Sequence, residues 1–207
     1  MSSVTTQSTD ASEGEVVSVV GPLDAETEDF AQQIADQVES FLLALRAISQ
    51  ESDAGSSISL LLLEISQVLL AGARLGAQRD FTPDTRYQPD VGPEPDLDAM
   101  RLRLADLLAP IDSYVFVFDP YLPEVVGSRL SDDLASIATD LDTGLRHFRR
   151  GDVEEALWWW QFSYVSSWGN LAGAALNALI SVVAHDRLDV ETFDADQVAV
   201  AEEVLAD

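Results

Sequence analysis

Few residues in this chain could support acid–base or metal chemistry. It contains two histidines, His147 and His185, beside 37 acidic residues. Asp133, Asp140 and His147 are spaced seven residues apart, which places them on one face of a helix but separates neighbours by about 10 Å along its axis. A metal ion needs ligands that converge at about 2 Å. This row therefore predicts no metal site by itself, and solvated or helix-capping carboxylates are the favoured explanation.

Other catalytic arrangements are missing from the sequence. There is no cysteine, which excludes thiolate nucleophiles, disulfides and cysteine-ligated metals. No G-x-S-x-G elbow and no phosphate-binding loop of the Walker or dinucleotide type occurs. Both histidines lie near predicted helix C-termini, where a cationic ring is stabilised, so we expect a structural role for them. The sequence predicts no cofactor and favours a protein that is not an enzyme.

The most unusual segment runs from Ala156 to Ala184 and carries no charged residue. Its tryptophans are Trp158, Trp159, Trp160 and Trp168. A helix that is apolar almost all round is normally central to a bundle. One stripe of small polar residues, headed by Trp159, could instead line a pocket or a partner interface; it contains Ser163, Ser166, Asn170, Gly173, Asn177 and Ser181.

The same segment is long enough to cross a membrane, and Gly169 and Gly173 have the small-xxx-small spacing of packed membrane helices. Gln161, four serines and two asparagines argue against that location, because polar side chains are costly in hydrocarbon. We therefore expect no membrane insertion.

Composition limits the class of partner. The chain has 207 residues and a formal net charge of -26, and all 11 basic residues are arginine. A surface this negative repels phosphate backbones, so nucleic-acid binding is disfavoured and we expect no nucleic-acid partner. The charge could recruit a basic protein or simply maintain solubility.

No signal-peptide pattern is present at the N-terminus, which favours the cytoplasm. One positive cluster, Arg146, Arg149 and Arg150, could hold an anion, but pairing with neighbouring acids is favoured.

Apolar residues recurring every three or four positions predict an all-α fold, a single bundle of about six helices around the long, uncharged C-terminal helix. Residues 1–22 are predicted to be a disordered tail and residues 23–207 one domain. The expected helices span about 24–49, 57–78, 95–110, 131–150 and 152–184, with a short one after Asp194. Ser131 is the expected N-terminal cap of its helix.

Residues 111–118 are ambiguous. The run Tyr114-Val115-Phe116-Val117-Phe118 has strand propensity, yet we find no convincing partner strand, and a lone strand leaves its backbone unpaired. A short buried helix is therefore favoured here.

The C-terminal half resembles a bacterial all-helical family known only as domain of unknown function 5063, over roughly residues 97–179. The matching pieces are Val117-Phe118-Asp119-Pro120, Ser131-Asp132-Asp133-Leu134 with Asp140-Leu141, and Glu155-Ala156-Leu157-Trp158 with Trp168-Gly169. The resemblance implies a helical bundle and lends no activity. It also implies a histidine directly before the Trp-Gly pair, where this chain has Ser167. Its matched polar residues, Asp119, Asp132, Asp133 and Asp140, are candidate site residues.

Two functions remain open. The first is a protein-binding or regulatory module that uses the acidic surface or Trp159 to engage a basic partner, with a homo-oligomer also possible. The second is a small-molecule-binding protein or enzyme in which Asp133 and Asp140 meet Trp158 or Trp160 in a cleft.

Overall fold

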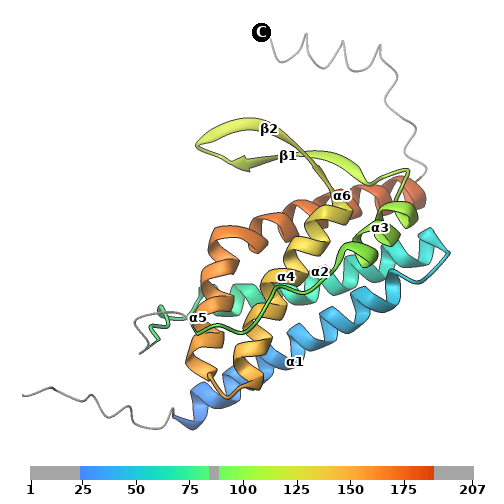
Figure 1. Ribbon diagram of the computed structural model, residues 1–207. Helices are drawn as coiled ribbons and strands as arrows, with labels where there is room; N and C mark the ends of the chain where they lie inside the picture. The colour runs from blue at the N-terminus through green and yellow to red at the C-terminus, as the bar shows by residue number, and fades with distance from the viewer. Residues whose placement is uncertain (1–23, 84–88, 189–207) are drawn as a thin grey trace, which may run out of the picture.

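The computed structural model describes residues 24–83 and 89–188 (Figure 1). The predicted tail over residues 1–22 and the predicted helix after Asp194 lie outside the described residues. Within them the protein is a bundle of helices with one β-hairpin that projects from it. The helical segments are α1 (Ala25–Ile48), α2 (Ala54–Gly76), α3 (Asp98–Leu107), α4 (Leu130–Arg149), α5 (Val153–Ser163), η1 (Tyr164–Trp168) and α6 (Gly169–Leu188). The predicted helical bundle is confirmed.

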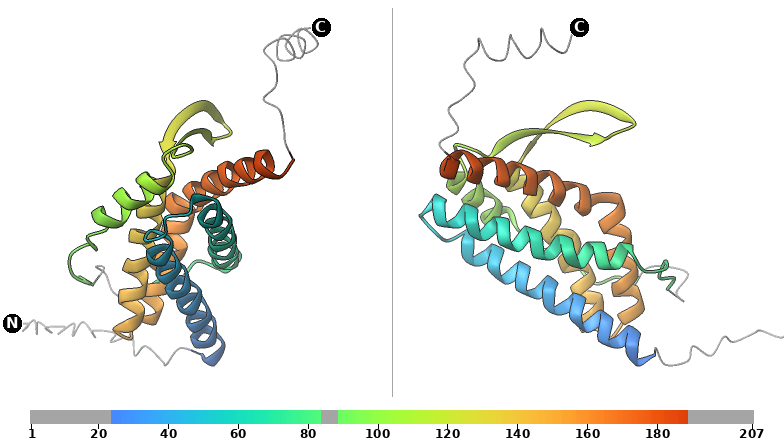
Figure 2. Two further views of the ribbon diagram at one scale, coloured as in Figure 1. Left: turned by 90° about the vertical axis from the view of Figure 1, so that its right-hand side faces the viewer. Right: turned by 180° about the vertical axis from the view of Figure 1, so that it is seen from behind.

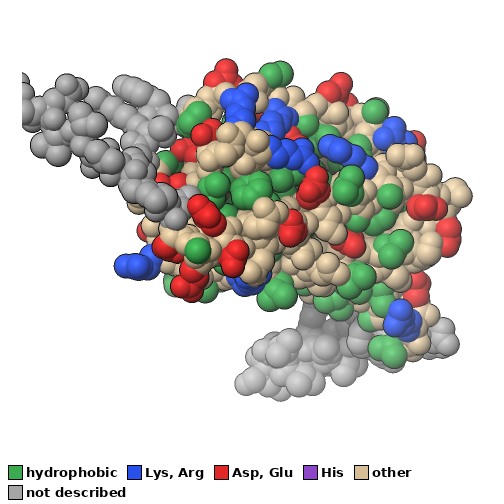
Figure 3. All heavy atoms as spheres, turned by 90° about the horizontal axis from the view of Figure 1, so that it is seen from below, with side chains coloured by type: hydrophobic (Ala, Val, Ile, Leu, Met, Phe, Trp, Pro, Cys, Tyr) green, Lys and Arg blue, Asp and Glu red, His purple; other side chains and the backbone are tan. Residues whose placement is uncertain are grey.

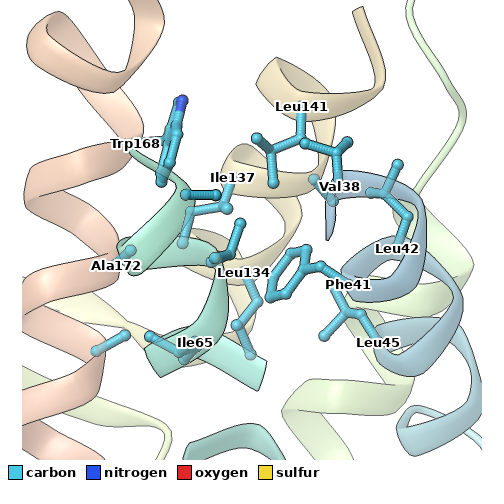
Figure 4. Close-up of a cluster of buried hydrophobic side chains, with 14 of the residues drawn as sticks. Val38, Phe41, Leu42, Leu45, Ile65, Leu134, Ile137, Leu141, Trp168 and Ala172 are labelled. Carbon is cyan, nitrogen blue, oxygen red and sulfur yellow. The ribbon is translucent and has the colours of Figure 1, made fainter. Parts of the chain in front are cut away.

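The hydrophobic core lies where α1, α2, α4 and the C-terminal helix meet (Figure 4). Phe41 of α1 points toward Leu134 and Ile137 of α4, and Trp168 and Ala172 close the opposite side. The labelled side chains are all fully or almost fully buried. Each comes from the apolar face that helical periodicity predicts, so burial of these faces against one another stabilises the bundle.

The expectation of a buried helix around Tyr114 was wrong. Residues Ser113–Asp119 form strand β1, which pairs antiparallel with β2, Leu122–Arg129. The partner strand follows immediately after the turn at Pro120-Tyr121, so the backbone of the run is paired locally. Figure 1 shows the hairpin standing over α6.

The C-terminal helix is continuous for 36 residues, Val153–Leu188, but it is not straight. A π-helical turn, η1, separates α5 from α6, and the chain changes direction there (Figure 1). Ser163 Oγ donates to Trp159 O at 2.7 Å and Ser166 Oγ to Phe162 O at 2.8 Å. Serine bonds to the preceding turn bend helices, and π-turns are a recognised cause of kinks.

The start of α4 is capped from a distant residue. We expected Ser131 to cap this helix, but it lies inside the first turn. Asp112, which is almost fully buried, accepts hydrogen bonds from Ser131 N at 2.8 Å and Ser131 Oγ at 3.1 Å. Because Asp112 directly precedes β1, one carboxylate joins the helix N-terminus to the base of the hairpin.

Two helices are long and apolar enough to cross a membrane by length and composition, α2 and the run Val153–Leu188. They lie side by side, as both views of Figure 2 show, and residues of each contribute to the shared core. Our expectation of no membrane insertion stays a prediction. Recovery of the full chain in the soluble fraction without detergent would support it, and sedimentation with membranes would contradict it.

Candidate functional site

Asp133 lies at the junction between α4 and the hairpin. Its side chain is almost fully buried. Tyr114 Oη donates to Asp133 Oδ2 at 2.6 Å, and Ser128 Oγ donates to Asp133 Oδ1 at 2.8 Å. Burial raises the pKa of Asp133, and the two hydrogen bonds oppose that shift. Because the donors come from β1 and β2, this carboxyl group ties both strands to the bundle.

Two further candidate acids have structural partners. Asp132 accepts a bond from Arg101 of α3 at 3.1 Å, which ties α3 to α4. Asp119 accepts from Tyr121 N at 2.8 Å, so it closes the hairpin turn. Neither Asp132 nor Asp119 shares a hydrogen-bond partner with Asp140 among the described residues.

Asp140 faces the π-turn. Ser167 Oγ donates to Asp140 Oδ2 at 2.9 Å, while Trp159 Nε1 donates to the backbone oxygen of Asp140 at 2.7 Å. Burial raises the pKa of Asp140, Ser167 opposes this, and the negative charge of Glu94 adds to the rise. The structure thus brings Asp140 and Trp159 together, but Trp159 is half-buried and its N–H is already bonded.

Trp160 and Trp168 belong to the core. Trp160 is fully buried and donates to Leu141 O at 3.0 Å. Trp168 is also buried, and its indole nitrogen has no hydrogen-bond partner among the described residues. Figure 4 shows that nitrogen pointing away from the labelled core side chains.

Trp158 lies apart from Asp133 and Asp140. Its ring stacks on Phe162 with centroids 5.3 Å apart and planes 7° from parallel. The pair lines a surface pocket of about 410 Å³ together with Asp80, Phe81, Thr82, Gln161, Val165 and Ser166. The expected cleft, in which Asp133 and Asp140 meet Trp158 or Trp160, is not formed by the described residues. Trp158 instead lines an aromatic pocket whose carboxylate is that of Asp80.

The structural role expected for His147 stays a prediction, and its ring lies inside the protein. His147 is fully buried, and neither ring nitrogen has a hydrogen-bond partner among the described residues. Burial lowers the pKa of His147; Asp152 opposes this shift and Arg150 adds to it. Removal of the ring from water is the largest contribution, and it outweighs the favourable negative charge of Asp152.

The arginine cluster at the end of α4 pairs with neighbouring groups, as predicted. Arg149 binds Glu39 of α1 at 2.6 Å, and Arg146 binds Asp142 at 2.6 Å. Arg146 and Arg150 also donate to the backbone oxygens of Pro93 and Asp90. Figure 3, the view from below, shows arginine side chains gathered among acidic ones. The last two bonds hold Asp90 and Pro93, which precede α3, against the end of α4. No group of three or more acidic or histidine side chains arranged to hold a metal ion occurs among the described residues.

The hairpin carries the most conspicuous exposed apolar surface. Tyr114 points to Asp133 on α4, so the alternating residues Val115 and Val117 lie on the opposite face of β1. Val117 pairs with Val125 of β2. Val115 is 66% exposed, Val125 70%, and Leu122 at the turn 68%. We call Val115, Val117 and Val125, together with exposed Leu122 at the turn, the outer face of the hairpin.

A cleft of about 360 Å³ separates β1 from α6. Residues 115–117 line one wall. The α6 wall consists of Gly169, Asn170, Gly173, Ala174 and Asn177. Half of the small polar stripe expected from the sequence therefore lines a cleft.

The sequence profile of DUF5063, a domain of unknown function, matches residues 25–185. The chain belongs to this family. The match is longer than the resemblance seen over residues 97–179, and it includes α1 and α2. Protein BF1032 from Bacteroides fragilis, whose crystal structure is known, has a TM-score of 0.57 to this DUF5063 domain at 18% sequence identity. The likeness covers 77% of this chain and 92% of that protein, and it supports the fold alone. A search of curated proteins gave no match.

This DUF5063 domain departs from the expected pattern at position 167, and the structure shows what the side chain there contacts. Ser167, where the resemblance implies histidine, faces the Asp140 carboxyl group. A hydroxyl group does not titrate near neutral pH, so this position supplies only a hydrogen bond here.

The contacts of two polar residues of this DUF5063 domain were not predicted from the sequence. Asp112 caps α4, and buried Gln161 accepts from Phe81 N at 3.0 Å and donates to Leu75 O at 2.9 Å. The hairpin signal was available, because Asp119-Pro120 separates two runs of strand-forming residues. No local pattern reveals the long-range contacts of Gln161.

Proposed function

We propose that this chain is a binding module that engages a basic partner protein through the outer face of its hairpin. The observation that carries the proposal is the exposure of Val115, Leu122 and Val125 on a two-stranded element. Contiguous exposed apolar side chains on a soluble protein mark interaction sites. The inner residues Tyr114 and Ser128 already attach the hairpin to the bundle, so the outer face is not needed for folding.

The charge of the molecule supports a basic partner. With a formal net charge of -26, long-range attraction favours proteins of opposite sign and speeds their association. Two copies of the chain repel one another for the same reason. The hairpin then supplies apolar contact area once the partner is close, and apolar burial at the centre of an interface contributes most of the affinity.

Affinity purification from the native host tests this proposal. The double variant Leu122→Thr/Val125→Thr keeps strand propensity and removes apolar surface. The matched control is Leu63→Gln/Leu70→Gln on α2, where the side chains are 50% and 65% exposed. We expect a basic partner, quantified by mass spectrometry, to be retained by the control and reduced at least tenfold with the hairpin variant. Equal recovery by all three proteins would refute the proposal.

The Trp158 pocket supports a second candidate function, the binding of a small aromatic or cationic molecule. Stacked Trp158 and Phe162 offer a π surface, and Asp80 supplies a negative charge at the same pocket. Intrinsic tryptophan fluorescence during titration with a panel of such molecules tests it. A saturable change that disappears in Trp158→Phe supports the pocket, and an unchanged spectrum across the panel rejects it.

A further inference from the structure

The cleft between β1 and α6 has one wall made of strand edge. The sheet has the order β1-β2 among the described residues, so β1 has a second edge without a strand partner. Residues 115–117 at this edge line the cleft, and Figures 1 and 2 show β1 passing over α6. An unpaired edge presents backbone N–H and C=O groups in the spacing of an extended chain. The natural ligand of such an edge is another strand.

The opposite wall has the chemistry to hold a peptide backbone. Asn170 and Asn177 are exposed and lie seven residues apart on α6, which is about 10 Å along the helix axis. Three residues of an extended chain span about 10 Å. A side-chain amide both donates and accepts, so each asparagine can bond one peptide group of such a chain.

Between Asn170 and Asn177 the α6 wall of the cleft has only small residues, Gly173 and Ala174. A Cβ atom placed on Gly173 would meet no atom within 4 Å, and the only side chain at position 174 is a methyl group. A backbone can therefore approach α6 closely at this point. Gly173 costs helix stability relative to alanine, by about 1 kcal/mol in a helix interior, and packing against the protein's own atoms does not require it.

We propose that the cleft binds an extended segment of the partner protein as a third strand along β1, with Asn170 and Asn177 holding its backbone from α6. This inference rests on the proposed function and names the conformation of the partner. The cleft wall contains no charged side chain, while Asp119 and Glu124 lie on the same hairpin. An uncharged segment flanked by arginine or lysine fits this charge distribution, and a second copy of a chain of net charge -26 does not.

A phage-displayed library of random twelve-residue peptides, selected on the full chain, provides the probe. Enriched peptides are then synthesised and their Kd measured by fluorescence anisotropy. We expect Gly173→Leu, which fills the cleft, to weaken binding at least tenfold, and Asn170→Ala/Asn177→Ala to weaken it roughly tenfold. The control Ala73→Leu, at an exposed position on α2, should bind as the wild type does. Leucine is a better helix former than glycine, so thermal denaturation should show no loss of stability in Gly173→Leu.

Pairing of the peptide backbone with β1 can be measured separately, by amide hydrogen exchange. Amide hydrogen exchange of residues 115–117 should slow when the selected peptide binds. No enriched peptide, equal affinity for Gly173→Leu, or unchanged exchange at β1 would each overturn the inference. If Gly173→Leu retains the native partner while Leu122→Thr/Val125→Thr loses it, the proposed function stands and the cleft is not its binding site. Retention of the partner by both variants rejects the proposed function itself.

Discussion

At the scale of single residues, the contact between α4 and α5 allows a direct test of packing. A Cβ atom at Gly144 would lie 2.2 Å from Trp160 Nε1, and Trp160 is fully buried. We expect Gly144→Ala to lower the free energy of unfolding by roughly 1–3 kcal/mol, because the indole must move and its bond to Leu141 O is strained. Urea denaturation followed by circular dichroism measures this. Gly173→Ala, with open space around it, should be neutral or stabilising, and similar stabilities of the two variants would contradict the packing argument.

His147 makes the stability of the fold sensitive to pH. Its folded-state pKa is lowered by burial, so the unfolded chain binds the proton more readily. The stability contributed by the neutral ring is complete above the unfolded-state pKa of about 6.5 and is lost as the pH falls below that value toward the folded-state pKa.

The variant His147→Leu isolates this contribution. Replacement of an unpaired buried polar group by an apolar one of similar size is neutral or stabilising. We expect the variant to gain stability relative to the wild type as the pH falls from 7.5 to 5, measured by urea denaturation at each pH. Because both proteins share all other titrating groups, a difference that is constant over this range would show that His147 does not titrate as described.

At the scale of elements, the attachment of the hairpin depends on Asp133. In Tyr114→Phe one oxygen of this buried carboxyl group loses its donor, which costs about 1–3 kcal/mol. We expect the amides of β1 and β2 to exchange faster with solvent while those in the middle of α4 change little. Tyr121→Phe serves as the control because that side chain is 91% exposed. Equal exchange in the two variants would mean that other contacts hold the hairpin.

The elements that sequence reasoning recovered are those set by local pattern. The face of α1 that contains Phe41 recurs with helical periodicity, so its burial follows from the sequence. The hairpin was missed because Pro123 and Gly127 interrupt the second strand, although proline is tolerated at a sheet edge. The π-turn was missed because it depends on side-chain bonds such as that of Ser163 to the previous turn.

The candidate site was only partly predictable for a different reason. The sequence indicated Asp133 and Asp140 as polar residues of note, and both have raised pKa values in the structure. Their partners Tyr114 and Ser167 lie 19 and 27 residues away, and periodicity carries no information on such pairs. The stripe containing Asn170 and Asn177 was recognised, but its opposite wall could not be placed without the hairpin.

At the scale of the whole molecule, electrostatic self-repulsion opposes folding. An excess of 26 negative charges destabilises a compact state, and salt screens this repulsion. Salt also weakens ion pairs such as Arg149–Glu39, but an exposed pair contributes only about 0–1 kcal/mol. The net repulsion therefore has the larger effect. We expect the Tm to rise when sodium chloride is increased from about 0.02 to 0.5 M, by roughly 2–4 °C for each kcal/mol gained.

The direction in which the Tm changes with salt also tests whether charge attracts the partner. Salt should stabilise the isolated chain while it weakens capture of a basic partner, because the same negative field acts in both cases. Differential scanning fluorimetry and partner capture over one salt series compare the two effects directly. The variant Leu122→Thr/Val125→Thr should keep the salt dependence of the Tm, since it changes no charge. A Tm that falls with salt would show that ion pairs outweigh self-repulsion in this protein. The net negative charge would then give no support to long-range attraction of a basic partner.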